Sequence, residues 1–530
     1  MKLLHITIKK LSPVLFYIII AGYFTYLQWG TGFADPDSFY HAGVSALMGQ
    51  GQLVLKQFPW FTFTTFSQNF TDHQFFYHLL LAIPSLFIPP LIATKALAVI
   101  LATLFFIMFC WFLKQTGIRY RFFYLIILLT TGPFIFRINL AKAGSLALIL
   151  LFMGIHSLWQ KKYTRLFTIT FLYVWTHAGW MSMGMVYFVW FVANFITMRL
   201  NDSEHAFLRM STKCIRILMS DRALWAIVLG MFFGVVFNPY FPNNIMFYWQ
   251  QAIQIGLVNY QSVINVGAEW YPFPISKLAI ELMGILIVCA SALGAFTLHC
   301  LFAKPKKLSH HINMLTTRVL HMTMLSGLWF ALTIKSARYV EYLAPSAILA
   351  GALLIELLMQ MGAWETIKKY TREHYHMYCA CACALGIFYL GLSWSEASTL
   401  KKPLSGTLPW NRLKESSAYL AANTPKNRLI FHTNWSDAPL LFFHNTHNRY
   451  MAGLDPTFFY LANPNLYRRY TDISRGGIHR PAEAIYRAFN TQYMLITLPQ
   501  DWNLNYQLKK EPRVQALFHD DESIVYRYSP

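Results

Sequence analysis

Acids and histidines gather in one short stretch of a chain that is otherwise poor in acids. The stretch ADPDSFYH, residues 34–41, follows the first hydrophobic run directly, in a chain of 530 residues with only 23 Asp and Glu. Asp is a preferred helix N-cap and Pro suits the first helical position, so we expect Asp35 to cap and Pro36 to open a helix that ends near residue 48. Asp37 is then free to act as a general base or to bind a cation, with His41 four residues on and on the same helix face.

Other candidates for chemistry lie beside later apolar runs. Glu269 is the only acid between residues 221 and 281, and Lys335 and Arg338 come just before an apolar run that begins near residue 344. An Arg at the end of a span is costly unless it pairs with an acid, such as Glu341, or faces a polar cavity. Because a guanidinium group matches phosphate oxygens bidentately, Arg338 is a candidate phosphate ligand with Lys335 beside it. His73 is a candidate for metal or phosphate binding, with a structural role as the alternative.

The composition is that of a membrane protein. Charged residues make up 13% of the chain and hydrophobic residues 56%, whereas soluble proteins average about 25% charged residues. Apolar runs of about 18 or more residues, enough to cross a bilayer, recur up to residue 396. The net charge of +21 is spread over clusters of Lys and Arg in alternate loops and not along a basic groove with stacking aromatic residues, which argues against a nucleic-acid partner.

The clusters of basic residues also predict the topology. We expect about 11 transmembrane helices, near residues 11–29, 91–113, 122–137, 143–160, 166–180, 182–198, 223–238, 278–302, 319–335, 344–361 and 375–395. The positive-inside rule then places the N-terminus in the cytoplasm. An odd number of spans puts external loops 30–90, 238–277 and 335–343 on the same side as the C-terminal part. Scattered cysteines and the lack of sorting signals fit a bacterial inner membrane, with that part in the periplasm.

Residues 397–530 predict a separate extracytoplasmic α/β domain, after a transmembrane catalytic domain at 1–396. Strand-like pieces alternate with helix-like pieces in this part of the chain. The predicted strands are Arg428–Trp435, Arg449–Asp455, Tyr493–Leu498 and Ser523–Tyr528, and the predicted helices are Ser416–Ala422, Ala438–Phe443 and Pro481–Phe489.

The pattern Asp37-Ser38-Phe39-Tyr40-His41 resembles the Asp-x-x-Phe/Tyr-His/Asn motif in the first external loop of oligosaccharyltransferase catalytic subunits. Those enzymes belong to the GT-C superfamily of membrane glycosyltransferases, and the overall layout is similar as well. The resemblance implies an inverting transfer of a sugar from a polyprenyl-phosphate or polyprenyl-diphosphate carrier to an acceptor outside the membrane. It implies that the loop acid, Asp37, activates the acceptor or binds a metal, that Glu269 assists, and that Arg338, with His41 and Lys335, holds the donor phosphate.

The sequence departs from that family at a second acidic motif. The loop before residue 143 reads Arg137-Ile138-Asn139-Leu140-Ala141-Lys142 and contains no acid. A site for Mg²⁺ or Mn²⁺ on Asp37, Glu269 and His73 would have fewer carboxylates than such cations usually find. This argues against metal dependence and favours Asp37 as a plain base.

In the C-terminal domain, Thr433-Asn434-Trp435-Ser436-Asp437 faintly resembles the Trp-Trp-Asp-Tyr-Gly motif that reads the acceptor in oligosaccharyltransferases. Only Trp435 and Asp437 match, which makes them candidates for acceptor binding. The alternative for Asp437 is a helix cap. The acceptor itself is left open among protein, lipid and glycan.

The function that these features favour is a membrane glycosyltransferase that uses a lipid-linked sugar donor. A polysaccharide polymerase or ligase on the same lipid carriers is the nearest alternative, because it needs the same donor site. A multi-pass transporter is the second alternative, but its mark would be ionisable residues and broken helices near the midplane of the membrane. Here the acids collect in the external loops.

Overall fold

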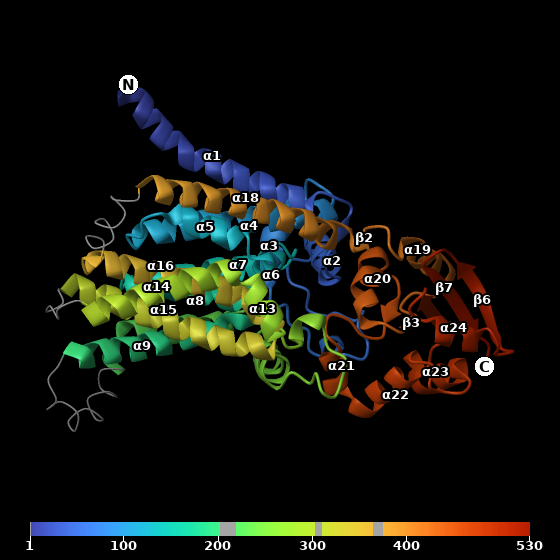
Figure 1. Cartoon of the computed structure of the whole chain (residues 1–530). Helices are drawn as coiled ribbons and strands as arrows, with labels where there is room; N and C mark the ends of the chain where they lie inside the picture. Colours follow the sequence, from blue (N-terminus) through green and yellow to red (C-terminus); the bar gives the residue numbers. More distant parts are fainter. Residues whose placement is uncertain (1, 202–218, 303–309, 364–374) are drawn as a thin grey trace.

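Two parts make up the chain, a long helical bundle and an α/β domain at one end of it (Figure 1). The computed structural model describes residues 2–201, 219–302, 310–363 and 375–530. The N-terminus lies at the end of the bundle away from the α/β domain, and α1 lies along α18. The first part is a helical membrane protein, as its composition predicts.

Helices occupy all of the predicted spans. In chain order these are α1 (Lys2–Gln28), α4 (Pro90–Gln115), α5 (Arg121–Leu129), α6 (Gly132–Ile138), α7 (Gly144–Trp159), α8 (Tyr163–Thr176), α9 (Ser182–Asn201), α11 (Arg222–Val236), α13 (Ile275–Glu281), α14 (Met283–Phe302), α15 (His310–Lys335), α16 (Val340–Gln360) and α18 (Tyr375–Gly406). Within the described ranges, 3 helical segments are long and apolar enough to cross a membrane, or up to 5 if each of two bent pairs counts as one span. The bent pairs are α5–α6 and α13–α14, at 85° and 81°. The number of spans therefore stays a prediction, as does the domain boundary at 396/397, which α18 crosses.

Short elements fill the three loops that we expect outside the membrane. They are α2 (Asp37–Gly49), η1 (Thr65–Ser67), α3 (Phe75–Ser85), α12 (Asn243–Trp249), the π-helix η4 (Gln250–Val258), η5 (Ala268–Trp270) and η6 (Ala337–Tyr339), while η2 (Ala178–Met181) joins α8 to α9. Helix α2 ends one residue beyond the predicted position, and its Phe39 and Val44 side chains are buried. Phe39 and Tyr40 pack against Phe443 and Phe442 of the C-terminal domain. A Cβ on Gly43 would lie 2.6 Å from the Phe442 ring, so this close approach requires glycine.

The C-terminal domain is built on a five-stranded sheet in the order β4-β3-β5-β7-β6. Strand β3 (Leu429–His432) is parallel to β4 (Arg449–Tyr450) and β5 (Tyr493–Thr497), and β7 (Ser523–Tyr528) and β6 (Val514–His519) continue the sheet in antiparallel fashion. The helices are α19 (Lys414–Asn423), η7 (Trp435–Asp437), α20 (Ala438–His444), α21 (Pro456–Ala462), α22 (Pro464–Ser474), α23 (Pro481–Phe489) and α24 (Trp502–Leu508). All five residues of β5 are buried, as expected for a parallel strand inside a covered sheet.

Backbone pairing joins the C-terminal domain to the first external loop. Strand β1 (Gly32–Phe33) pairs with β2 (Leu408–Pro409). Further along the loop, Tyr450 N donates to Trp60 O at 2.7 Å and accepts at its own carbonyl from Thr62 N at 2.9 Å, so the loop extends the edge of β4. The acidic start of α2 is thereby held between the bundle and the α/β domain.

Candidate active site

A cavity of about 950 Å³ opens where the bundle meets the C-terminal domain. It is lined by the start of α2, the α6–α7 region, the segment 265–273, η6 and two segments of the C-terminal domain, 435–436 and 454–455. Asp37, Glu269 and Arg338 all line it, as the sequence predicts, and so does Trp435. Residues more than 200 positions apart thus meet in one place because they lie on loops at the same end of the bundle.

Two carboxylates share one ammonium group at the start of α2. Lys142 Nζ lies 2.8 Å from Asp35 Oδ2 and 2.8 Å from Asp37 Oδ2. Asp35 Oδ1 also accepts a hydrogen bond from the Asp37 backbone N–H at 2.8 Å, and the helix begins at Asp37 and not at Pro36. The N-cap position is thus Pro36 and not Asp35, so the expected helix start is one residue too early, and Asp35 is instead a member of the charged site.

The pKa of Asp37 is raised to about 7, because burial outweighs the attraction of Lys142 and Asp35 adds a second negative charge. A carboxyl group with this pKa is half ionised near neutral pH and can both accept and release a proton there. It has the properties of a general base.

A second group of charges surrounds Glu269. One carboxylate oxygen of Glu269 pairs with Arg137 Nη1, and the other accepts from Arg338 Nη1 at 3.0 Å. Arg137 Nε in turn donates to Glu341 Oε2 at 2.9 Å. Glu341 was the expected partner of Arg338, but it pairs with Arg137. Burial opposes ionisation of Glu269, yet its cationic neighbours outweigh burial and hold its pKa well below the usual range.

This donor set does not fit the metal site that the sequence allowed. Among the described residues, no three His, Cys, Asp or Glu side chains are grouped so that they could hold a metal ion. Asp37 is paired with Lys142, and both oxygens of Glu269 are paired with guanidinium groups. A divalent cation would have to displace three positive side chains to reach these carboxylates. His73 lies against a different cavity, with its ring stacked on Phe247 at 4.8 Å.

A smaller apolar cavity of about 330 Å³ adjoins the charged one. Arg338 and Trp270 line both cavities, and the guanidinium carbon of Arg338 lies 4.9 Å from the centre of the Trp270 ring. His73, His177 and Tyr342 also line the smaller cavity, and Arg338 Nη2 is 3.2 Å from His177 Nε2. Arg338 is therefore the charged group at the junction of a polar and an apolar space.

Two candidate phosphate ligands lie elsewhere. His41 is only 2% exposed and lines neither of these cavities. Its Nδ1 is hydrogen-bonded to His78 Nε2 at 2.8 Å, and His78 Nδ1 donates to Asp72 Oδ2 at 2.7 Å. His41 lies one helical turn from Asp37, as the spacing predicts, but its ring takes part in this buried chain and does not line the charged cavity. Lys335 donates to the Leu257 carbonyl at the exposed surface and also lines neither cavity.

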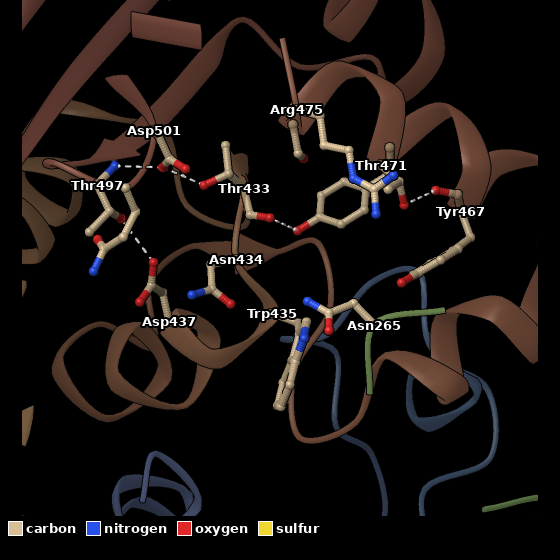
Figure 2. Close-up of a pocket in the computed structure, with 13 residues that line it drawn as sticks. Asn265, Thr433, Asn434, Trp435, Asp437, Tyr467, Thr471, Arg475, Thr497 and Asp501 are labelled. Carbon is tan, nitrogen blue, oxygen red and sulfur yellow. Dashed lines mark hydrogen bonds between the residues drawn. The ribbon is translucent and has the colours of Figure 1, made fainter. Parts of the chain in front are cut away.

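The two candidate acceptor residues differ in position. Trp435 lines the charged cavity and, on the other side, a pocket inside the C-terminal domain (Figure 2). Asp437 lines only that second pocket and is 3% exposed. Asp437 stands at the N-cap position of α20, but its side chain makes no capping bond there and accepts from the Thr497 hydroxyl at 2.8 Å.

Sequence reasoning underrated three members of the site. Arg137 and Lys142 stood out in the sequence only as the basic residues of a segment without acids, and both line the charged cavity. Asp455 also lines it, at the start of α21, where its carboxylate caps the helix by accepting from the Thr457 N–H at 2.8 Å. The only signal in the sequence was charge in short loops beside apolar helices.

The same fold occurs in solved structures of the arabinofuranosyltransferase AftD from Mycobacteria. One structure has a TM-score of 0.54 and 9% identity, and covers 97% of this chain and 40% of that chain. A mutant of the same enzyme gives a TM-score of 0.51 and 11% identity, with 97% and 41% covered. This chain thus spans about two fifths of the length of those structures. No family model and no curated protein matches the sequence.

The chain therefore shares its fold with a glycosyltransferase over 97% of its length, which agrees with the fold that the acidic loop and the layout of spans led us to expect. At this level of identity the similarity concerns the fold alone, and the function has to be argued from the cavity.

Proposed function

We propose that the protein is a glycosyltransferase that moves a sugar from a polyprenyl-phosphate-linked donor to an acceptor outside the cytoplasm, with inversion. One observation carries the proposal. A carboxylate with a pKa near neutrality and a pair of fixed guanidinium groups line the same cavity, next to an apolar pocket. The AftD fold supports the same class of reaction.

The donor would lie across the junction of the two cavities. Its isoprenoid chain suits the apolar cavity beside Trp329 and Tyr342, and its phosphate suits Arg338 at the junction. Glu269 holds Arg338 and Arg137 in place, so these groups are positioned before the substrate arrives. Such preorganised charge stabilises a leaving group at little cost of rearrangement.

In the reaction, Asp37 removes the proton from an acceptor hydroxyl. The hydroxyl oxygen forms a bond to the anomeric carbon from the face opposite the phosphate. The bond between the anomeric carbon and the phosphate oxygen breaks, and the electron pair leaves with the polyprenyl phosphate, which Arg338 and Arg137 stabilise. Attack from the opposite face inverts the anomeric centre, and the carbon is never bonded to Asp37.

The proposal includes an orientation. The cavity and the C-terminal domain would face the periplasm of a bacterial inner membrane, and the N-terminus would face the cytoplasm. A cysteine placed in the C-terminal domain, which has none of its own, would then react with an impermeant thiol reagent added to spheroplasts. Labelling only after lysis would contradict this orientation.

The test of the function is transfer from a synthetic polyprenyl-phosphate sugar in membranes that contain the protein. Asp37→Asn should abolish the product, whereas Asp521→Asn, an exposed acid outside the cavity, should not change it. Full transfer by Asp37→Asn would exclude the mechanism. A ladder of products in place of a single transfer would identify a polymerase on the same carrier.

A further inference from the structure

The C-terminal domain contains a second pocket that the catalytic proposal does not use. It has a volume of about 270 Å³ and is lined by residues from three places in the domain and by Asn265 of the external loop. Thr433, Asn434 and Trp435 follow β3, Gln500 and Asp501 follow β5, and α22 supplies one wall through Tyr467 and Tyr470 (Figure 2).

The position of this pocket in the sheet is that of a ligand site. Strands β3 and β5 are parallel neighbours, with Ile430 opposite Tyr493 and His432 opposite Leu495. Their carboxyl ends therefore reach the same edge, where ligands bind in open α/β sheets. The loops that leave these ends are tied together, since Asp501 accepts from the Thr433 hydroxyl and from Thr497 N–H at 2.9 Å.

The lining is polar but almost without positive charge. Asp437 and Asp501 are both acids, and burial raises the pKa of Asp437 to about 6 and also raises that of Asp501. The one cation that lines the pocket is Arg475, which is exposed. A phosphate or carboxylate ligand would face two acids that are closer to the interior than the arginine, so an anion is disfavoured.

Groups suited to hydroxyls are free in the pocket. The Asn434 side-chain amide N–H₂, the Gln500 side chain and the Trp435 indole N–H make no hydrogen bond to any described residue, while the Asn434 carbonyl oxygen is used locally. Trp435 and Tyr467 add aromatic surface to the lining (Figure 2). Ring faces beside amides and carboxylates match a sugar, which has apolar C–H faces and an edge of hydroxyls.

We propose that this pocket binds one neutral sugar unit of a glycan acceptor. Its volume is below the range of about 300–1,000 Å³ that is usual for drug-sized ligands, which suits a single ring. Trp435 and Asn265 line this pocket and the charged cavity alike, so a glycan held here has a short path to Asp37. This makes the acceptor a saccharide chain, and the assignment of the bound sugar to the acceptor rests on the proposed function.

Direct binding tests the pocket without any transfer reaction. The full-length protein in nanodiscs would be titrated with methyl glycosides of arabinofuranose, glucose, galactose and mannose and with their linear trisaccharides, followed by saturation-transfer NMR. We expect at least one glycoside to bind wild type and Asp37→Asn equally. Gln500→Ala, which removes an exposed side chain, should weaken binding about fivefold, the value of one hydrogen bond of about 1 kcal/mol.

The controls separate this proposal from the catalytic one. Gln515→Ala changes an exposed glutamine on β6 outside the pocket and should bind as wild type does. Trp435→Ala should lose binding. Lack of binding by every glycoside, equal binding by Gln500→Ala, or binding of inorganic phosphate in their place would overturn the pocket assignment even if transfer proceeds. Binding without any transfer by wild type would instead refute the glycosyltransferase proposal and leave the sugar site intact.

Discussion

The charged cavity and the pocket of the C-terminal domain share Trp435 and Asn265 but differ in the kind of side chain that lines them. The cavity is held by ion pairs between segments far apart in the chain, such as Arg137 with Glu269 and Glu341. The pocket is formed by loops that leave neighbouring strands, and it offers amides, hydroxyls and rings. Fixed charge suits the making and breaking of bonds to phosphate, and neutral polar groups suit recognition of a sugar.

The largest loss of transfer activity should come from replacing the proposed general base, Asp37. Asp37→Asn keeps the size and one hydrogen-bond acceptor but cannot take a proton, and we expect kcat to fall by about 10²–10⁴-fold, the usual value of general base catalysis. Glycoside binding in the other pocket should stay the same. Transfer assays and NMR binding on the same preparation check both. A loss of binding in step with kcat would break the distinction between the two regions.

The next largest loss of activity should come from changing the shape, but not the charge, of the side chain at Arg338. Arg338→Lys keeps the charge but loses the planar fork that Glu269 holds. We expect kcat/KM for the lipid donor to fall by about 10–100-fold, since a lost hydrogen bond to a charged group costs about 1.5–3 kcal/mol. The affinity for methyl glycosides is the internal control. An unchanged kcat/KM would remove Arg338 from donor binding.

The pH dependence should belong to the charged cavity alone. Because the pKa of Asp37 is raised to about 7, its carboxylate is protonated as the pH falls through that value, and kcat/KM should drop about tenfold per unit below it. Asp35→Asn removes the like charge and leaves Lys142 to Asp37 alone. It should shift the acidic limb to lower pH. An unshifted limb would mean that another group titrates.

The charged cavity and the pocket of the C-terminal domain also differ in how much of each could be predicted from the sequence. Apolar runs predict the helices, and the positive-inside rule places the loops of Asp37, Glu269 and Arg338 on one side, so their meeting in one cavity could be foreseen. The ion-pair partners could not. Arg137, at the end of α6, and Lys142, just after it, pair with residues more than 100 positions away, and Glu341 looked like a local partner of Arg338. For the same reason, the hydrogen bond between His41 and His78 depends on packing that no helical spacing reveals.

In the C-terminal domain, β3, β5, β7 and α23 could be predicted from their buried or amphipathic patterns. Strand β6 was missed because it is an edge strand with exposed positions and no run of buried residues. The pocket was missed because parallel pairing of β3 with β5 joins residues 63 positions apart, such as Ile430 and Tyr493. Only that pairing brings Asn434 and Asp501 to one edge of the sheet. The motif around Trp435 therefore predicted the residues that follow β3 but not those that follow β5.

The smallest effect should come from metal removal. Every acid that the sequence offered to a metal in the cavity is already neutralised by a side chain, Asp37 by Lys142 and Glu269 by two guanidinium groups. These cations supply the positive charge that a divalent ion would bring to a departing phosphate. We therefore expect transfer to be unchanged after dialysis against a chelator, and Lys142→Ala, which frees two carboxylates, to be the variant in which added Mn²⁺ has an effect. Loss of wild-type transfer on chelation, with recovery on Mn²⁺ or Mg²⁺, would show that the ion pairs open to admit a metal when substrate binds.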